Sequence, residues 1–156
     1  MSKWRPVQAI QVKVIGLCVH QGSLLAGEVV NDDGSVKGVR PLGGLIEFGE
    51  TRGTAIEREF REELDTDIIC YGKWLVFENL YIHGGKRGHE IVFAIEVELV
   101  DRTLYDRELI VFSEDSGADC TARWYPIDEL KSGSVELYPD GLLEALSCIQ
   151  AVILSP

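Results

Sequence analysis

One acidic segment limits most strongly what this chain can fold into. Residues 43–68, GGLIEFGETRGTAIEREFREELDTDI, place eight acidic side chains in 26 positions. Ile56, Phe60 and Leu64 recur every four residues there, which predicts an amphipathic helix with one apolar stripe. Thr51 is a suitable N-cap for its start. Because the flanking segments are rich in β-branched residues, we expect this helix to pack its stripe against a sheet.

Strand patterns lie on both sides of this helix. Residues 9–20 alternate polar and apolar side chains and predict a strand, and a turn then leads to a second strand over 23–30. After the helix, residues 74–82 and 89–100 predict two further strands. The glycine-rich segment 83–88 between them is typical of a hairpin loop.

The remaining segments give weaker patterns. Residues 31–38 form a polar loop, and residues 42–48 are a glycine-interrupted strand or loop. We expect 104–122 to be an irregular, mobile surface segment, 123–130 a strand followed by a turn, and 138–153 a terminal helix docked on the sheet. Together these elements predict an α+β fold, with a mixed sheet between helices, in a single domain that covers residues 1–156.

Composition excludes several classes of protein. The chain has 26 acidic against 15 basic residues and a net charge of -11, so an extended nucleic-acid surface is not expected. A phosphate ligand would therefore need a bound cation to attract it. No apolar run reaches the length of a membrane span, and the start lacks the pattern of a secretory signal. The four cysteines lie far apart, which favours reduced thiols and a cytoplasmic location over metal or disulfide use.

The acidic helix has two interpretations. At about 100° per residue, Glu59, Glu62 and Glu63 lie on one face. Carboxylates gathered in this way are hard oxygen ligands that suit Mg²⁺ or Mn²⁺. Charged stretches are also commonly solvated faces with no ligand. Gly43 and Gly44 favour binding, because backbone without side chains lets a ligand approach closely.

These residues resemble the Nudix box, a pattern of fixed glycine, glutamate and arginine positions. All of its charged positions are present, at Glu50, Arg58, Glu59, Glu62 and Glu63, and Gly44 and Phe60 also match the pattern. The match departs at its end, where Asp65 and Thr66 replace the usual glycine and apolar residue. The resemblance implies a stand-alone Nudix domain with an α/β/α sandwich fold, and the segments RPLGGLIEFGE and GHEIVF resemble a bacterial branch of the family.

The resemblance implies a Mg²⁺-dependent pyrophosphohydrolase, with Mn²⁺ able to replace Mg²⁺, that cleaves a phosphoanhydride bond in a nucleotide or a nucleoside diphosphate-linked compound. Glu62 and Glu63 would be metal ligands and the Gly43 carbonyl a further one. Glu59 would be either a ligand or the base that accepts the water's proton. Arg58 would orient these carboxylates together with Glu50, although it could also be an ordinary surface partner of Glu62. Glu59, Arg58 and Glu62 are thus the expected catalytic residues.

A carboxylate outside the helix often completes such a metal site. Glu114 is our preferred candidate because it precedes the strand that contains Trp124. The other candidates are Glu90, Asp115 and Asp119, and any of them could be a plain exposed carboxylate.

Three basic residues are expected to bind substrate, because substrate choice belongs to the loops that contain them: Arg40, Lys86 and Arg87. His83 and His89 flank the last two and could contact phosphate or base, although a plain solvated hairpin is the favoured interpretation. The partner would be a small nucleotide or nucleotide conjugate, and the chain a monomer or a homodimer. A non-catalytic Nudix-like nucleotide sensor is the alternative function. An isomerase of isoprenoid diphosphates shares the fold, but no residue here favours it.

Overall fold

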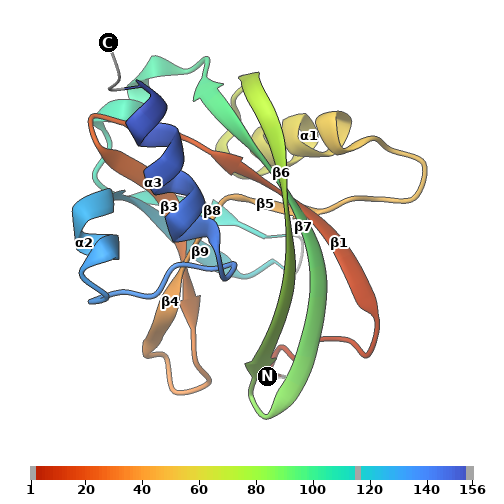
Figure 1. The fold of residues 1–156 in the computed structure, drawn as a ribbon. Coiled ribbons are helices and arrows are strands. Elements are labelled where there is room, and N and C mark those ends of the chain that lie inside the picture. Colours follow the sequence, from red (N-terminus) through yellow and green to blue (C-terminus); the bar gives the residue numbers. More distant parts are fainter. Residues whose placement is uncertain (1–2, 115–116, 154–156) are drawn as a thin grey trace.

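The computed structural model describes residues 3–114 and 117–153 and divides the strands between two sheets (Figure 1). The first sheet has four strands in the order β5-β1-β7-β6. β1 pairs antiparallel with β5 and parallel with β7, and β7 pairs antiparallel with β6. Their bounds are β1 Ile10–Leu17, β5 Gly43–Leu45, β6 Ile68–His83 and β7 Lys86–Leu99.

The second sheet contains five strands around β3. β3 pairs antiparallel with β2, β4 and β9, and β8 pairs antiparallel with β9. Their bounds are β2 Val19–His20, β3 Ser23–Val30, β4 Val36–Pro41, β8 Ile110–Ser113 and β9 Asp119–Pro126. The α+β class and the mixed strand directions are confirmed. The division into two sheets was not predicted.

Helices cover opposite sides of the strands (Figure 1). α1 packs on one apolar cluster, which includes Val14 and Phe60, whereas α2 and α3 pack on a second cluster, which includes Ile15 and Leu146. Val14 and Ile15 are consecutive on β1, so their side chains point to opposite faces of the first sheet. The helix bounds are α1 Arg52–Leu64, α2 Ile127–Lys131 and α3 Leu142–Ile153, with a 3-10 helix, η1, over Arg102–Asp106.

The acidic helix begins directly after the predicted N-cap, Thr51, and ends at Leu64, the last residue of the predicted apolar stripe. Thr51 caps α1 by accepting a hydrogen bond from the Thr54 backbone N–H at 3.2 Å. The chain leaves the helix through Asp65 in the left-handed conformation, with φ 51 and ψ 43. The next residue, Thr66, is buried, and its Oγ1 accepts a hydrogen bond from the Asp101 backbone N–H at 3.0 Å. The exit from the helix is therefore a left-handed turn formed without glycine.

Four local predictions differ from the structure. Segment 104–122 is not irregular, because it contains β8, whose alternate residues Ile110 and Phe112 are buried in the core. The polar loop predicted over 31–38 contains the first residues of β4, and the turn expected after the strand within 123–130 is the short helix α2. The hairpin loop predicted over 83–88 reduces to the turn at Gly84 and Gly85, both of which have positive φ.

Two predictions from composition can be compared with the described residues. None of their helices is long and apolar enough to cross a membrane. The four cysteines all lie in the described part of the chain and are free thiols, as expected.

Candidate active site

A glycine makes room for the most buried carboxylate of α1. Glu59 is only 5% exposed, and its side chain lies against Gly44 of β5. A Cβ added at Gly44 would lie 2.4 Å from Glu59 Oε1, so any side chain there would displace the carboxylate. At Gly43 a Cβ would lie 1.9 Å from the Val14 carbonyl oxygen. The two glycines therefore serve different contacts: Gly43 lets β5 pair closely with β1, and Gly44 accommodates Glu59.

Arg58 connects the acidic side chains of the box. Its guanidinium donates to Glu50 from Nε at 3.1 Å and from Nη2 at 2.6 Å. Nη1 donates to Glu59 Oε1 at 2.9 Å and to Glu62 Oε2 at 3.2 Å, and Nη2 also reaches the Leu45 carbonyl at 3.0 Å. Arg58 is thus more than a surface partner of Glu62, because it joins α1, β5 and the loop that contains Glu50.

The charges of this network reinforce each other. The Arg58 guanidinium holds the pKa of Glu50 below its ordinary value, and a hydrogen bond from the Glu47 backbone N–H adds to that effect. In turn, the bond to Glu50 raises the pKa of Arg58, with a further contribution from Glu59. Glu50 and Arg58 therefore stay ionised at neutral pH. Arg58 holds the Glu59 carboxylate in place through its hydrogen bond to Oε1.

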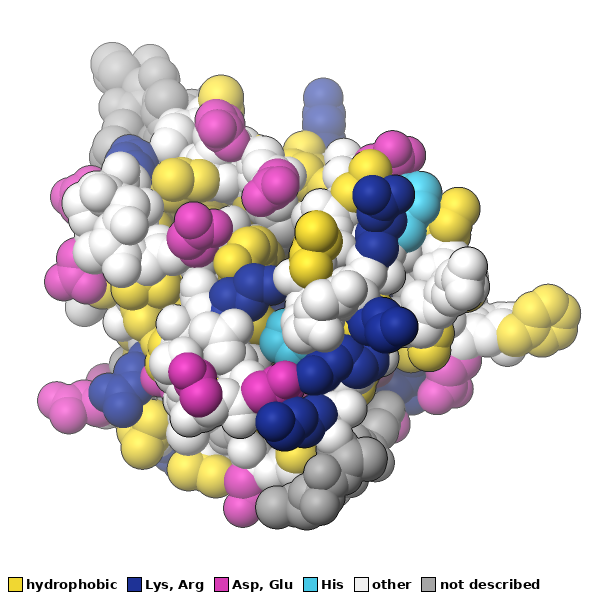
Figure 2. Space-filling view, turned by 90° about the horizontal axis from the view of Figure 1, so that it is seen from below, with side chains coloured by type: hydrophobic (Ala, Val, Ile, Leu, Met, Phe, Trp, Pro, Cys, Tyr) yellow, Lys and Arg dark blue, Asp and Glu magenta, His cyan; other side chains and the backbone are white. Residues whose placement is uncertain are grey.

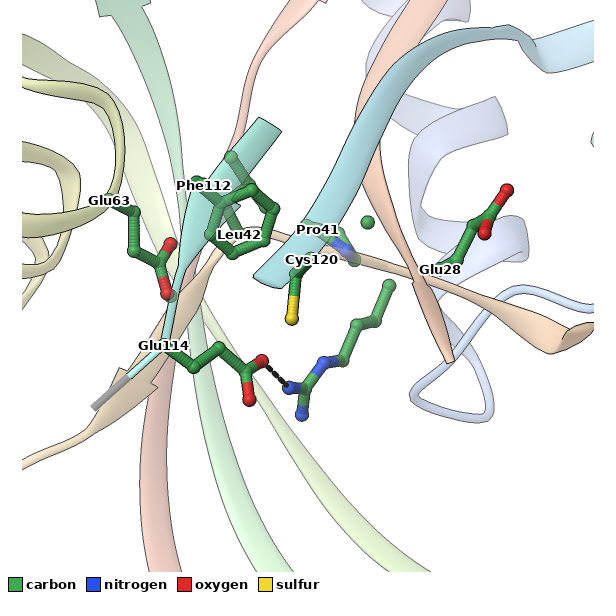
Figure 3. A pocket seen from close by; sticks show the side chains of 10 residues that line it. Glu28, Pro41, Leu42, Glu63, Phe112, Glu114 and Cys120 are labelled. Atoms are coloured by element: carbon green, nitrogen blue, oxygen red, sulfur yellow. Dashed lines mark hydrogen bonds and ion pairs between the residues drawn. The ribbon is translucent and has the colours of Figure 1, made fainter. Parts of the chain in front are cut away.

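The fourth box carboxylate, Glu63, faces a cleft between the two sheets (Figure 3). Gly43, Arg40 and Glu114 line the same cleft, and Arg40 Nη2 donates to Glu114 Oε1 at 3.0 Å. Figure 3 shows Glu63 and Glu114 approaching from the same side, whereas Glu28 lies across the cleft and points away. The structure therefore brings the predicted Glu114 and Arg40 next to the box.

Cys120 also lines this cleft but is a poor nucleophile. Burial raises the pKa of its thiol to about 11, and the charge of Glu114 adds to the rise. At neutral pH the thiol is protonated, whereas nucleophilic attack requires the thiolate.

The donors around the cleft fit Mg²⁺ or Mn²⁺ in kind. Glu63, Glu114 and Gly43 line the cleft, and Glu59 and Glu62 belong to the same helix as Glu63. Their carboxylate and carbonyl oxygens are the ligands that hard cations prefer. Within residues 3–114 and 117–153, no three His, Cys, Asp or Glu side chains are already gathered as a metal site. Glu59 and Glu62 are bound to Arg58 and Glu114 to Arg40, so a cation would have to compete with these ion pairs.

The structure places the other two predicted substrate residues elsewhere. Lys86 and Arg87 lie at the tip of the β6–β7 hairpin. Gly44 lies opposite Val14 of β1, and Val14 pairs with Phe93 of β7. Arg87 lies six positions before Phe93, which is about 20 Å along the strand. Figure 2 looks onto the end of the molecule that carries the hairpin tips, where Lys and Arg side chains gather. These two residues are thus not brought to the acidic helix.

Of the other carboxylate candidates, Glu90 belongs to a separate buried network. Lys13 Nζ lies 2.6 Å from Glu90 Oε1, and Tyr81 and Asn79 donate to the same carboxylate at 3.2 and 3.4 Å. Sequence reasoning missed this network, although a lysine in an apolar strand was a signal for it. Asp119 accepts a hydrogen bond from Ser113, and Asp115 lies outside the described residues.

Comparisons with known proteins identify the family. The family profile described as NUDIX domain matches residues 9–146. In structure, the chain is similar to a NUDIX hydrolase from Nitrosomonas europaea, with a TM-score of 0.59 and 20% identity over 92% of this chain and 90% of that one. It is also similar to the E. coli ORF135 protein, with a TM-score of 0.56 and 17% identity over 97% and 100% of the two chains.

A third solved structure, of MutT from Aliivibrio salmonicida and Vibrio cholerae, gives a TM-score of 0.51 and 17% identity over 88% of this chain and 96% of that one. At these identities the structural likeness establishes the fold alone. Comparison with curated proteins found no match. The family assignment comes from the profile, which covers most of the chain. The chain belongs to the NUDIX domain family and is a hydrolase that acts on phosphoanhydride bonds.

Proposed function

We propose that this chain is a Mg²⁺-dependent pyrophosphohydrolase that cleaves a phosphoanhydride bond in a nucleotide or a nucleoside diphosphate-linked compound, and that it acts as a single cytoplasmic domain. The observation that supports this most strongly is the cradle around Glu59. Gly44 gives the carboxylate its place, and Arg58 holds it from the other side at 2.9 Å. A merely solvated helix face would require neither contact.

Four groups would hold the cation, namely the carboxylates of Glu62, Glu63 and Glu114 and the carbonyl of Gly43, and Glu59 would be either a fifth ligand or the base. Mg²⁺ or Mn²⁺ bound there would neutralise negative charge on the phosphoryl oxygens and make a bound water more acidic. Glu62 is the most accessible of the three helix carboxylates considered as ligands, Glu59, Glu62 and Glu63, with 44% of its side chain exposed. It is therefore the one that can turn from Arg58 towards a ligand at least cost.

The chain's own residues would contribute positioning and proton transfer. Glu59 is the best candidate for the base, because burial and two fixed contacts hold it in one place. Arg58 would act through the carboxylates by orienting them. The Arg40 guanidinium would bind phosphate oxygens, for which its planar pair of donors is suited. Lys86 and Arg87 stay predictions for the distal part of a long substrate.

A panel of substrates tests this proposal. Purified protein should release phosphate or pyrophosphate, or a mononucleotide, from one or more members of a panel of NTPs, oxidised dGTP, ADP-ribose, nucleotide sugars and dinucleoside polyphosphates. Turnover should require Mg²⁺ or Mn²⁺ and stop when EDTA is added. Absence of metal-dependent turnover on the whole panel would contradict the proposal. Tight nucleotide binding by calorimetry without product would then favour the non-catalytic sensor.

A further inference from the structure

Arg40 and Glu114, which are expected to bind ligands of opposite charge, form an ion pair with each other in the cleft. Arg40 lies near the end of β4, just before the chain crosses to β5, and Glu114 follows β8 directly. Their ion pair measures 3.0 Å, with 43% and 37% of the two side chains exposed. Glu114 is the carboxylate expected to bind the cation, and Arg40 the cation expected to bind phosphate. In this state each side chain is paired with the other instead of with its own expected ligand.

The exposure of this pair makes it exchangeable. An ion pair with both partners partly in water is weak, because water and salt compete with it. The neighbouring Lys13–Glu90 pair differs, since its side chains are 14% and 9% exposed and Glu90 also accepts from Tyr81 and Asn79. Of these two pairs, only the one between Arg40 and Glu114 can therefore open without stranding a buried charge.

The Lys13–Glu90 pair also affects which ligand Arg40 binds after Arg40 has separated from Glu114. The pKa of Lys13 is lowered, first by burial and next by the positive charge of Arg40, so the two cations lie within electrostatic range of each other. Without Glu114, Arg40 would face Lys13 with less compensation. A phosphate anion would restore the balance of charge.

We propose that the Arg40–Glu114 ion pair couples cation binding to diphosphate binding: Glu114 exchanges Arg40 for the divalent cation, and the released Arg40 binds the diphosphate. This rests on the proposed function of the site. Each ligand removes one partner of the pair and so frees the other partner for the second ligand. By thermodynamic reciprocity, the exchange then raises the affinity of each ligand by the same factor, about 5-fold for a partly exposed ion pair.

The coupling can be measured without turnover. Mn²⁺ affinity is determined by EPR titration, alone and with α,β-methylene-ADP, whose bridging carbon prevents hydrolysis between the two phosphates. The Mn²⁺ that this nucleotide binds in buffer is subtracted. Wild-type protein should bind Mn²⁺ at least about 5-fold more tightly with the nucleotide present, because direct contact between Mn²⁺ and phosphate adds to the exchange.

Three variants separate the exchange from other effects. Arg40→Gln should bind Mn²⁺ alone more tightly than wild type, because Glu114 is no longer paired, and its coupling factor should fall about 5-fold, to the part that direct contact between Mn²⁺ and phosphate supplies. Glu114→Gln should bind Mn²⁺ more weakly, and its coupling factor should fall by a similar amount. Arg102→Gln breaks another exposed pair, Arg102–Glu98 at 2.7 Å, and should behave like wild type. Thermal melts show that each variant is folded.

The sign of the first change decides the question. If Arg40→Gln keeps the wild-type coupling, or binds Mn²⁺ alone more weakly, the exchange is wrong. Arg40→Lys, which keeps the charge, should retain part of the coupling and gives a second reading if Arg40→Gln does not fold. If the protein turns over substrate but Arg40→Gln keeps the wild-type coupling, only the exchange is wrong. If Mn²⁺ and nucleotide binding are coupled through Arg40 but no substrate is turned over, only the proposed hydrolysis is wrong.

Discussion

Replacing Gly44 by alanine should damage catalysis far more than stability. The added Cβ would lie 2.4 Å from Glu59 Oε1, whereas ordinary contact begins at 3.4 Å, so the carboxylate has to retreat by about 1 Å. It can do so because the atoms that clash are the end of a flexible side chain. The retreat weakens the 2.9 Å bond from Arg58 and moves the proposed base out of line.

Both effects have an expected size. A misplacement of about 1 Å in a catalytic group can cost about 100-fold in rate, so kcat/KM should fall by roughly that factor. The stability cost should stay near 1 kcal/mol, because only a side-chain end moves, and this corresponds to a fall in Tm of about 2–4 °C for a chain of this length.

The assay compares three glycine variants by thermal melt and by turnover of the best substrate in the panel. In Gly43→Ala the clash is 1.9 Å from the Val14 carbonyl, which is backbone, so stability should fall by about 3 kcal/mol or more. In Gly53→Ala the nearest atom is 3.9 Å away within α1, so this variant should be slightly more stable and fully active. An unchanged kcat/KM in Gly44→Ala would contradict the claim that Gly44 makes room for Glu59 in its catalytic position.

Three further predictions concern the box and its exit. Glu59→Gln should lower kcat by about 100-fold or more with little change in Tm, and near-normal kcat would remove its role as base. Arg58 lowers the pKa of Glu50 from its ordinary value of 4.5, so this pair stabilises the fold above that pH and loses its effect as pH falls through the lowered value. Melts of wild type and Glu50→Gln should therefore differ most above pH 4.5 and converge as the pH falls below it, and a constant difference would contradict the pairing. Asp65 adopts φ 51, so Asp65→Gly should raise stability by about 0.5–1 kcal/mol while Asp65→Ala lowers it, and equal Tm values for the two would show that the turn carries no strain.

Local patterns were predicted well from the sequence. The apolar stripe and Thr51 define α1 almost to the residue, because both depend on neighbours within a few positions. β8 was missed for the opposite reason. Its four residues are too short to show a period, and they form a strand only because β9 pairs with them.

Contacts between distant residues account for the rest. Arg40 and Glu114 are 74 positions apart, and each was expected in the site for its own reason, but no pattern indicated that they would bind each other. The same holds for Lys13 and Glu90, which meet because β1 pairs with β7 in parallel. The division of the strands into two sheets follows from such pairings, and they are settled by the packing of the whole chain.

The most direct measurement concerns the cation itself. Mn²⁺ bound to the protein is counted by EPR with α,β-methylene-ADP present, in wild type and in the double variant Glu62→Gln, Glu63→Gln. We expect a saturable site in wild type that is absent from the double variant, whose thermal melt still shows a folded protein. Equal Mn²⁺ occupancy in the two proteins, or none in wild type, would contradict a role for the carboxylates of α1 in holding a metal for phosphate chemistry.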